Sequence, residues 1–275
     1  MKLRYLGTAA AEGLPALFCS CNTCRKARAL GGRNIRMRAQ ALVDDTLLID
    51  LGPDLLANSI RFGIDLTTLT HCLVTHDHED HFYDLNLGYI RRGCYSTPPE
   101  DWVFRIYSNP EVIEKVSRFS GPSGGQLEGI SVAPFQPFPV GKYTVTALKA
   151  WHGTENPYVY AISDGRKTLL YAHDTDLFPE ETWDYIARSG LRFDLVSMDC
   201  TEGAMEDIPY RAHMCLGRNR LFKQKLLALG AADDRTLFVS NHFSHNGKDA
   251  CYDDYAPQAE KEGIRTSYDG MEIEF

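Results

Sequence analysis

A short stretch of the chain concentrates side chains that bind metal ions. The sequence Thr-His-Asp-His-Glu-Asp-His-Phe directly follows the apolar run Cys72–Val74, which predicts a β-strand. Alternate residues of an extended segment point to the same side, so His76 and His78 can reach one ion. A turn at Asp80 and His81 can direct both side chains to a second ion nearby. Because imidazoles and carboxylates suit Zn²⁺, Mn²⁺ or Fe²⁺, the motif predicts a pair of divalent cations, Mn²⁺ or Zn²⁺.

Three more potential ligands each follow a separate apolar run. The runs 143–150, 169–172 and 237–240 predict three further strands. Any one of these ligands alone is typical of an ordinary surface or core position. However, α/β folds place functional side chains just after strands, so the shared position favours a common centre. The three residues are His152, Asp174 and His242.

A second group of potential ligands lies near the start of the chain. Cys19, Cys21 and Cys24 have the spacing CxCxxC, in which three thiolates can converge on one tetrahedral Zn²⁺. His245 is the expected fourth ligand. Four protein ligands leave no open position, so the zinc of this loop, at about residues 19–24, is expected to be structural. A disulfide and simple buried thiols are the alternatives.

Composition and charge limit the class of protein. Of the 275 residues, 44% are hydrophobic and 24% are charged, which is typical of a globular protein. No run approaches the roughly 20 apolar residues of a membrane span, and Glu12 and Pro15 interrupt the apolar start, so we expect no membrane partner. The eight cysteines are not spaced like a disulfide framework, which indicates a cytoplasmic location. The net charge of −8 argues against nucleic acid as a partner, and a homodimer is left open.

Short apolar runs separated by turn signals predict a chain dominated by β-strands. Helices are expected at Pro53–Phe62, Glu111–Phe119, Pro179–Arg188 and Leu216–Leu229. Because some neighbouring strands must be antiparallel, the pattern predicts a single α/β domain over residues 1–275, with a two-layer sheet core and helices outside. The expected strands are Leu3–Leu6, Ala41–Val43, Leu47–Asp50, Cys72–Val74, Val103–Tyr107, Tyr143–Leu148, Tyr158–Ile162, Leu169–Ala172, Leu195–Met198 and Leu237–Val239.

The order of these motifs resembles that of the metallo-β-lactamase superfamily. An HxHxDH motif is followed along the chain by His, Asp and His, as in that superfamily. The resemblance implies a metal-dependent hydrolase with an αββα sandwich, in which two mixed β-sheets are flanked by helices. It also implies that Asp174 bridges the two ions and that Asp50 supports the site from behind the ligands. The first ion would be held by His76, His78 and His152, and the second by Asp80, His81 and His242.

Further motifs narrow the resemblance to a phosphodiesterase family of phosphonate breakdown. Besides CxCxxC, the tripeptides Met-Asp-Cys at 198–200 and Arg-Ala-His at 211–213 and the closing stretch 268–273 are similar to motifs of that family. The resemblance implies a small phosphorylated sugar as substrate. That substrate would be 5-phosphoribosyl 1,2-cyclic phosphate, and its product ribose 1,5-bisphosphate.

The expected chemistry is attack of activated water on a phosphate ester. Two divalent ions can share a water molecule and lower its pKa towards about 7, so that hydroxide attacks phosphorus in line. The expelled sugar oxygen needs a proton. We expect His213 to be the general acid, because a histidine with a pKa near 6.5 can be protonated at working pH. Asp80 is the second expected catalytic residue.

Other functions are compatible with the same motifs. A nuclease of the superfamily and a lactone or thioester hydrolase use similar ligands. A third alternative is an accessory or binding protein without hydrolytic activity, as in a coenzyme-PQQ branch that shares the CxCxxC spacing. The segment 92–137 carries no recognisable motif, and we expect it to shape substrate selection.

Overall fold

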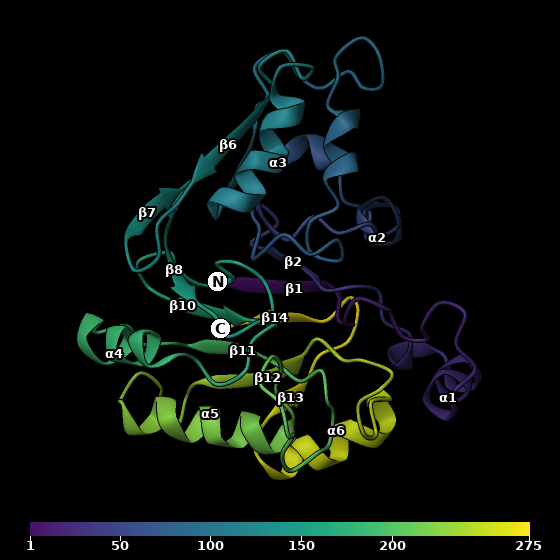
Figure 1. Cartoon of the computed structure of the whole chain (residues 1–275), viewed down its shortest axis with the longest axis vertical. Helices are drawn as coiled ribbons and strands as arrows, with labels where there is room; N and C mark the ends of the chain where they lie inside the picture. The colour runs from purple at the N-terminus through teal and green to yellow at the C-terminus, as the bar shows by residue number, and fades with distance from the viewer.

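Two seven-stranded β-sheets form the centre of the protein in a computed structural model that describes all 275 residues (Figure 1). Each sheet combines antiparallel and parallel pairs, so both are mixed. The first sheet has the order β14 (Glu272–Glu274), β1 (Lys2–Gly7), β2 (Gln40–Val43), β3 (Leu47–Ile49), β4 (His71–Leu73), β5 (Phe104–Ser108) and β6 (Leu127–Ser131). The second has the order β13 (Arg265–Thr266), β12 (Leu237–Asn241), β11 (Leu195–Asp199), β10 (Thr168–Ala172), β9 (Tyr158–Ser163), β8 (Tyr143–Lys149) and β7 (Pro137–Val140).

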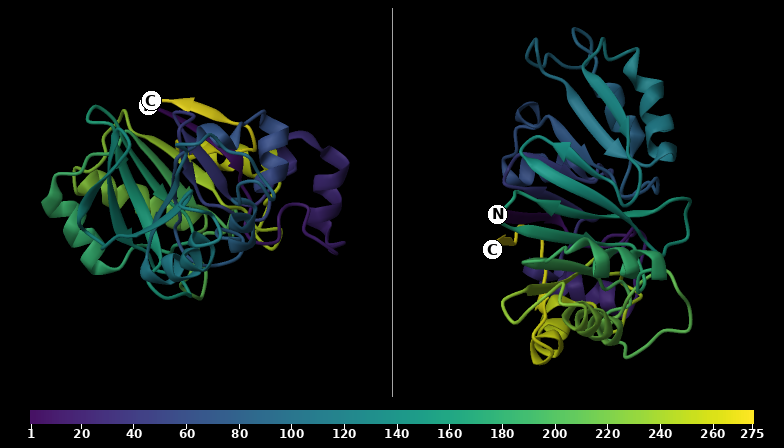
Figure 2. Two further views of the ribbon diagram at one scale, coloured as in Figure 1. Left: turned by 90° about the horizontal axis from the view of Figure 1, so that it is seen from above. Right: turned by 90° about the vertical axis from the view of Figure 1, so that its left-hand side faces the viewer.

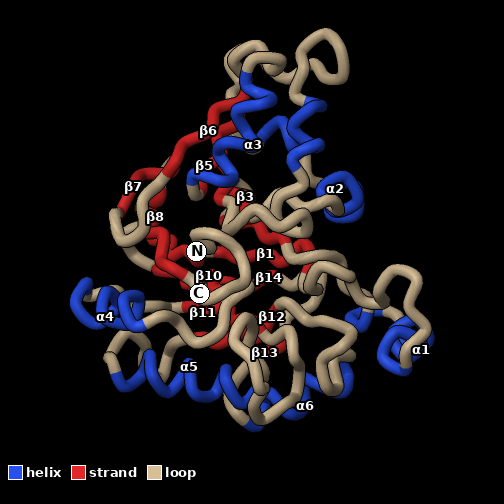
Figure 3. The backbone as a smooth tube through the Cα atoms, viewed as in Figure 1, coloured by secondary structure: helices blue, strands red, loops and turns tan.

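Helices cover the outer face of each sheet, which gives four layers in the order α/β/β/α (Figures 1 and 2). The expected αββα sandwich is therefore confirmed. Helices α2 (Leu55–Phe62) and α3 (Pro110–Ser120) pack on the first sheet. Helices α4 (Glu180–Ser189), α5 (Leu216–Ala228) and α6 (Tyr252–Lys261) pack on the second. Helix α1 (Asn22–Leu30) lies beside the sandwich (Figure 3). None of the six helices is both long and apolar enough to cross a membrane.

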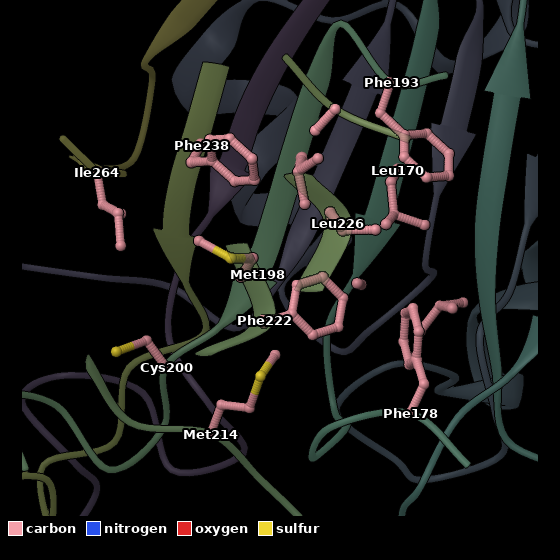
Figure 4. Close-up of a cluster of buried hydrophobic side chains, with 14 of the residues drawn as sticks. Leu170, Phe178, Phe193, Met198, Cys200, Met214, Phe222, Leu226, Phe238 and Ile264 are labelled. Carbon is pink, nitrogen blue, oxygen red and sulfur yellow. The ribbon is translucent and has the colours of Figure 1, made fainter. Parts of the chain in front are cut away.

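Three separate hydrophobic clusters fill the spaces between the four layers. One of 21 buried residues lies between the sheets, one of 14 lies under α2 and α3, and one of 24 lies under α4, α5 and α6. In the last cluster the ring of Phe222 is fully buried, and its centroid lies 4.8 Å from that of Phe178 (Figure 4). It also lies 5.1 Å from the ring centroid of Trp183. Burial of a side chain of this size contributes about 1.5–3 kcal/mol, so these clusters hold the layers together.

Several short elements were not expected from the sequence. They are α1, α6 and the strands β6, β7, β13 and β14. Helix α2 also begins at Leu55 rather than Pro53, because residues 53 and 54 form a turn. Strand β14 brings the end of the chain to its start, where the amino group of Met1 lies 3.1 Å from the carbonyl oxygen of Phe275.

The strand directions bring several strand ends to one rim. Strands β3 and β4 are parallel to each other, as are β10, β11 and β12. Strand β8 is antiparallel to β9, which is antiparallel to β10, so β8 and β10 also run in the same direction. The loops after these strands carry the potential metal ligands.

Candidate metal centre

The structure gathers the seven predicted ligands of the catalytic pair into two adjoining clusters. In each cluster one ligand atom from every residue lies within 4.8 Å of the others. The clusters share Asp174, whose side chain is 4% exposed. The first contains His76, His78, His152 and Asp174, and the second contains Asp80, His81, Asp174 and His242.

In the first cluster, the imidazoles of His76, His78 and His152 face one another beside Asp174. The Nε2 atom of His76 lies 3.0 Å from Nδ1 of His78 and 3.2 Å from Oδ2 of Asp174. The Nε2 atom of His152 lies 3.1 Å from the same Nδ1 of His78. Burial lowers the pKa of His76 to about 4 and also lowers the pKa of His152, so both rings are neutral at neutral pH. Neutral imidazole is the form that binds metal ions.

In the second cluster, both oxygens of Asp174 face histidine. Its Oδ2 lies 2.9 Å from Nε2 of His81, and its Oδ1 lies 3.2 Å from Nε2 of His242. The Nε2 atoms of His81 and His242 are themselves 3.2 Å apart, and Oδ2 of Asp80 lies 3.2 Å from His81. Because the carboxylate of Asp174 touches imidazoles of both clusters, it has the position of a bridging ligand.

Partners behind the ligands fix which nitrogen of each ring carries the proton. The Nδ1 atom of His81 lies 2.7 Å from Oδ2 of Asp50, which is fully buried. The Nδ1 atom of His242 lies 2.9 Å from Oγ1 of Thr201. That of His152 lies 3.2 Å from the carbonyl oxygen of residue 212. Since each partner accepts a hydrogen bond, the proton stays on Nδ1 and the lone pair on Nε2 points into the cluster.

This set of donors fits a pair of divalent cations. The facing Nε2 atoms of His81 and His242 lie 3.2 Å apart, as do Nε2 of His76 and the carboxylate oxygen beside it. Atoms of this kind need positive charge between them. Despite burial, the carboxylates of Asp80, Asp50 and Asp174 raise the pKa of His81, so a proton supplies part of this charge until a cation replaces it. Oδ1 of Asp174 is also buried and accepts no hydrogen bond that satisfies the usual geometry. Nitrogen and carboxylate ligands of this kind suit Zn²⁺ and Mn²⁺.

The proposed general acid, His213, lies next to these ligands. Its Nδ1 is 3.2 Å from Oδ2 of Asp199, 3.3 Å from Oδ1 of Asp174 and 3.2 Å from Oγ1 of Thr201. Burial acts to lower the pKa of His213, but the two carboxylates outweigh it and raise the pKa to about 11. Its ring centroid is 5.0 Å from that of His152, so it lies at the edge of the centre.

Close backbone contacts hold the ligand loops in place. A Cβ atom on Gly52 would lie 2.1 Å from the carbonyl oxygen of Asp80, so the chain approaches the HxHxDH loop more closely than any larger residue permits. The amide of Leu51 also donates to the carbonyl oxygen of His81 at 2.7 Å. The loop after β3 therefore supports the loop after β4.

The cysteine loop forms a separate cluster with His245. The Sγ atoms of Cys19 and Cys21 lie 3.4 and 3.5 Å from Nδ1 of His245, and Cys24 completes a group whose ligand atoms are all within 4.8 Å of one another. The hydrogen bond with His245 lowers the pKa of Cys21 to about 6, which favours the thiolate that binds zinc. All eight cysteines are free. These four side chains could supply all the ligands of a closed tetrahedral site.

The remaining two histidines belong to the packing of the sheets. The Nε2 atom of His173 lies 2.7 Å from Oγ of Ser197, and its ring packs on Tyr171 at a centroid distance of 3.8 Å. His71 contacts the hydroxyl of Tyr107 at 3.3 Å. Neither ring belongs to a candidate metal cluster.

The sequence matches a known protein family over most of its length. A family described as "Beta-lactamase superfamily domain" matches residues 45–232. The chain belongs to this superfamily. The match includes six of the seven ligands of the candidate centre, all but His242.

Individual relatives of this superfamily member are distant in sequence. The probable metallo-hydrolase YhfI of Bacillus subtilis is 24% identical over 172 residues, which are 62% of this chain and 67% of that protein. A diphosphatase of the PhnP family has a TM-score of 0.72 with 20% identity and covers 100% of this chain and 97% of its own. Zn²⁺-bound PqqB of Methylobacterium extorquens has a TM-score of 0.71 with 18% identity, and the match covers 100% of each chain. The short form of human tRNase Z has a TM-score of 0.67 with 16% identity, and the match covers 100% of this chain and 99% of that chain. The three solved structures share the fold.

Two polar residues beside the centre of this β-lactamase-superfamily chain were not expected to take part. Asp199 ends β11, and its Oδ2 accepts a hydrogen bond from the backbone amide of Asp174 at 3.1 Å. Thr201 contacts both His213 and His242. The position of Asp199 at a strand end, like that of Asp50 after β3, was the signal in the sequence that could have identified it.

Proposed function

We propose that this chain is a metal-dependent phosphodiesterase that hydrolyses a small cyclic phosphate ester. The preferred substrate is 5-phosphoribosyl 1,2-cyclic phosphate and the product ribose 1,5-bisphosphate. The observation that carries the proposal is Asp174, whose two carboxylate oxygens face imidazoles of two separate clusters. The fold shared with a diphosphatase of the PhnP family supports chemistry at phosphorus.

Two divalent cations would be held by the two clusters, with Asp174 as the shared ligand. When bound, such a pair makes a water molecule acidic near neutral pH and neutralises negative charge on phosphoryl oxygens. The ions would be Mn²⁺ or Zn²⁺, and a structural Zn²⁺ would occupy the cysteine cluster.

His213 supplies the proton that the leaving oxygen needs. Its Nδ1 faces the carboxylates of Asp199 and Asp174, which leaves Nε2 as the nitrogen that can donate to substrate. One P–O bond forms to the attacking water oxygen and the P–O bond to the sugar 2-oxygen breaks, while Nε2 gives its proton to that oxygen. The carboxylate of Asp199 stabilises the protonated ring before transfer and keeps its orientation.

Asp80 accepts the proton that the attacking water loses. Its carboxylate is largely buried and touches Nε2 of His81 at 3.2 Å, so it lies among the ligands rather than in solvent. With Asp80 as base and His213 as acid, one proton is taken up and one is released for each ester bond that is cleaved.

A panel of substrates tests this function. The metal-loaded protein is incubated with 5-phosphoribosyl 1,2-cyclic phosphate, other cyclic phosphates, bis-aryl phosphates, a lactone and a thioester, and the products are identified by phosphorus NMR. We expect hydrolysis of the phosphate diesters only, and metal analysis should find one ion at the cysteine cluster and two at the centre. Hydrolysis of the lactone or thioester without the phosphates would contradict the proposal.

Two alternatives have support from the shared fold. The fold shared with human tRNase Z is compatible with a nuclease, but the net charge of −8 opposes binding to an RNA backbone. The fold shared with PqqB is compatible with the accessory role that the CxCxxC spacing leaves open. Cleavage of a tRNA precursor with no hydrolysis of cyclic phosphates would assign the chain to the nucleases. A single bound ion and no activity on any substrate would favour the accessory role.

A further inference from the structure

We propose that Arg211 and Trp151 form a subsite for a second anionic group of the substrate, beside the metal centre. The subsite rests on the proposed function, since it selects among phosphate esters. The guanidinium carbon of Arg211 lies 4.1 Å from the centroid of the Trp151 ring. Both residues adjoin the centre in the chain: Trp151 precedes His152, and the carbonyl oxygen of Ala212 lies 3.2 Å from Nδ1 of His152.

The position of the guanidinium is fixed by two residues of the loop after β10, of which Asp176 is buried. Its Nε donates to Oδ2 of Asp176 at 3.0 Å, and its Nη2 donates to the carbonyl oxygen of Leu177 at 3.2 Å. The side chain of Asp176 is only 2% exposed, and Asp176 lies two residues after the shared ligand Asp174. The loop that presents Asp174 therefore also anchors Arg211. A cation held in this way loses little conformational entropy when it binds an anion.

The guanidinium of Arg211 has N–H groups left to bind a ligand. Arginine carries five N–H groups, and the two contacts above use two of them. The side chain of Arg211 is 49% exposed, and Trp151 is 41% exposed. The remaining N–H groups therefore reach solvent, next to an exposed indole that can pack against the carbon atoms of a sugar.

The charges around Arg211 leave positive charge available. Oδ2 of Asp176 also forms an ion pair with Nη1 of Arg218, at 2.8 Å, so one buried carboxylate is paired with two guanidinium groups. Arg218 has a second partner, Asp207, but that carboxylate is 77% exposed and water screens it. Arg211 thus shares its only carboxylate partner with Arg218, so its guanidinium can still attract an anion although the protein carries a net charge of −8.

A lysine near the HxHxDH loop, Lys115, has no such charge available for a ligand. The Nζ atom of Lys115 lies 3.1 Å from the carboxylate of Asp77 and 2.9 Å from the carbonyl oxygen of the same residue. Its charge is balanced by a carboxylate that no other cation shares among the ion pairs of the structure. Arg211 is thus better suited than Lys115 to bind substrate.

The ligand chemistry follows from the shape of the guanidinium. Its planar fork of N–H groups matches the oxygens of a phosphate monoester, which it can bind through two parallel hydrogen bonds. The subsite therefore selects a cyclic ester whose sugar carries a separate phosphate group. A substrate with the cyclic ester alone makes no contact with Arg211.

The test compares two esters that differ only in the second phosphate. We would measure kcat/KM for 5-phosphoribosyl 1,2-cyclic phosphate and for ribose 1,2-cyclic phosphate. Hydrogen bonds to a charged group correspond to a preference of about tenfold to a hundredfold for the first ester. Arg211→Gln should abolish this preference, mainly through KM, and Arg211→Lys should retain part of it. Arg188→Ala is the control, since that exposed arginine of α4 donates only to the backbone of its own helix, and its preference should equal that of the natural protein.

Binding measured without hydrolysis separates the subsite from the proposed function. Calorimetric titration with ribose 5-phosphate should give affinity about tenfold or more weaker for Arg211→Gln than for Arg188→Ala. Equal affinities, or an unchanged preference between the two esters, would overturn the subsite and leave the hydrolase intact. Weaker binding without hydrolysis of either ester would retain the subsite and refute the proposed function. If Arg211→Gln does not fold, as judged by circular dichroism, Arg211→Lys replaces it: a preference smaller than that of Arg188→Ala would support the subsite, and an equal preference would overturn it.

Discussion

The carboxylate of Asp50 should control metal binding through one proton on His81. Oδ1 of Asp50 accepts from the amide and the hydroxyl of Thr75, at 2.9 and 3.0 Å, and Oδ2 faces Nδ1 of His81 at 2.7 Å. In Asp50→Asn, the amide of Thr75 still needs an acceptor, so the Asn oxygen must take the place of Oδ1. The Asn NH₂ group then faces Nδ1 of His81. That nitrogen must accept, and its proton must move to Nε2, the atom that points at the other ligands.

The expected loss of metal affinity follows from the wrong tautomer of one ligand, His81. Replacement of a residue behind a metal ligand typically weakens metal affinity by about 10- to 100-fold, which is about 1.4–2.7 kcal/mol. The backbone should not add to this cost. Asp50 has a φ of 66°, and asparagine tolerates the left-handed region as well as aspartate does. We therefore expect the ion beside His81 to be weakened selectively.

Metal content after dialysis against increasing concentrations of chelator measures this change. Asp50→Asn should lose one ion at about 10- to 100-fold lower chelator concentration than the natural protein, while the other ions follow the natural curve. Asp44→Asn is the matched control. Asp44 also has a left-handed φ, 48°, and its carboxylate accepts from the amide of Lys2 and the hydroxyl of Tyr143, in a hairpin remote from the ligands. Identical chelator curves for the two variants would refute the proposed control of His81 by Asp50.

Three further changes probe the acid, the zinc cluster and the ligand loop. His213→Ala should slow hydrolysis of the cyclic ester by about 10²–10⁴-fold with unchanged metal content; loss of an ion instead would make His213 a ligand. Cys24→Ser should remove one zinc per chain and lower the melting temperature, and full zinc content would contradict the assignment of this buried thiol. Gly52→Ala should weaken the ion held by Asp80, because its Cβ would lie 2.1 Å from a carbonyl oxygen of the ligand loop. Gly121→Ala, which meets nothing within 4 Å, should leave metal affinity unchanged.

The sandwich was predictable because its central strands are continuous apolar runs. Strands β10 and β11 are almost entirely buried between layers, so their sequences contain few polar residues. Helix α6 gave no such signal. It contains Pro257 in its interior and three acidic residues, and it is held in place by burial of Tyr255 and Ala259 under the second sheet. Packing against the rest of the protein overrides its weak local preference for a helix. The edge strands β13 and β14 have two and three residues, too few for any periodic pattern.

The ligands were predictable for a different reason, which also explains what was missed. Histidine and aspartate crowded into one strand end are rare unless they bind a metal ion, so residue type and spacing alone indicate the centre. Asp199 ends strand β11 and Thr201 follows it; the Met-Asp-Cys motif marked Asp199 in the sequence but gave it no role. Their roles depend on which side chains lie opposite, namely His213 and His242, and these come from distant parts of the sequence. Only the folded chain brings them together.

The backbone at the centre indicates that the ligands, rather than the sheets, determine which residues occupy these positions. Asp50, Asp174 and His242 have φ angles of 66°, 50° and 64°, in the left-handed region that favours glycine. Each such residue costs about 1–3 kcal/mol, and glycine would relieve that cost where the chain leaves β3, β10 and β12. Glycine, however, offers no side chain to orient or bind an ion. The strain is therefore retained for the sake of the side chains, and cation binding should offset it, so that metal affinity and stability of the fold depend on each other.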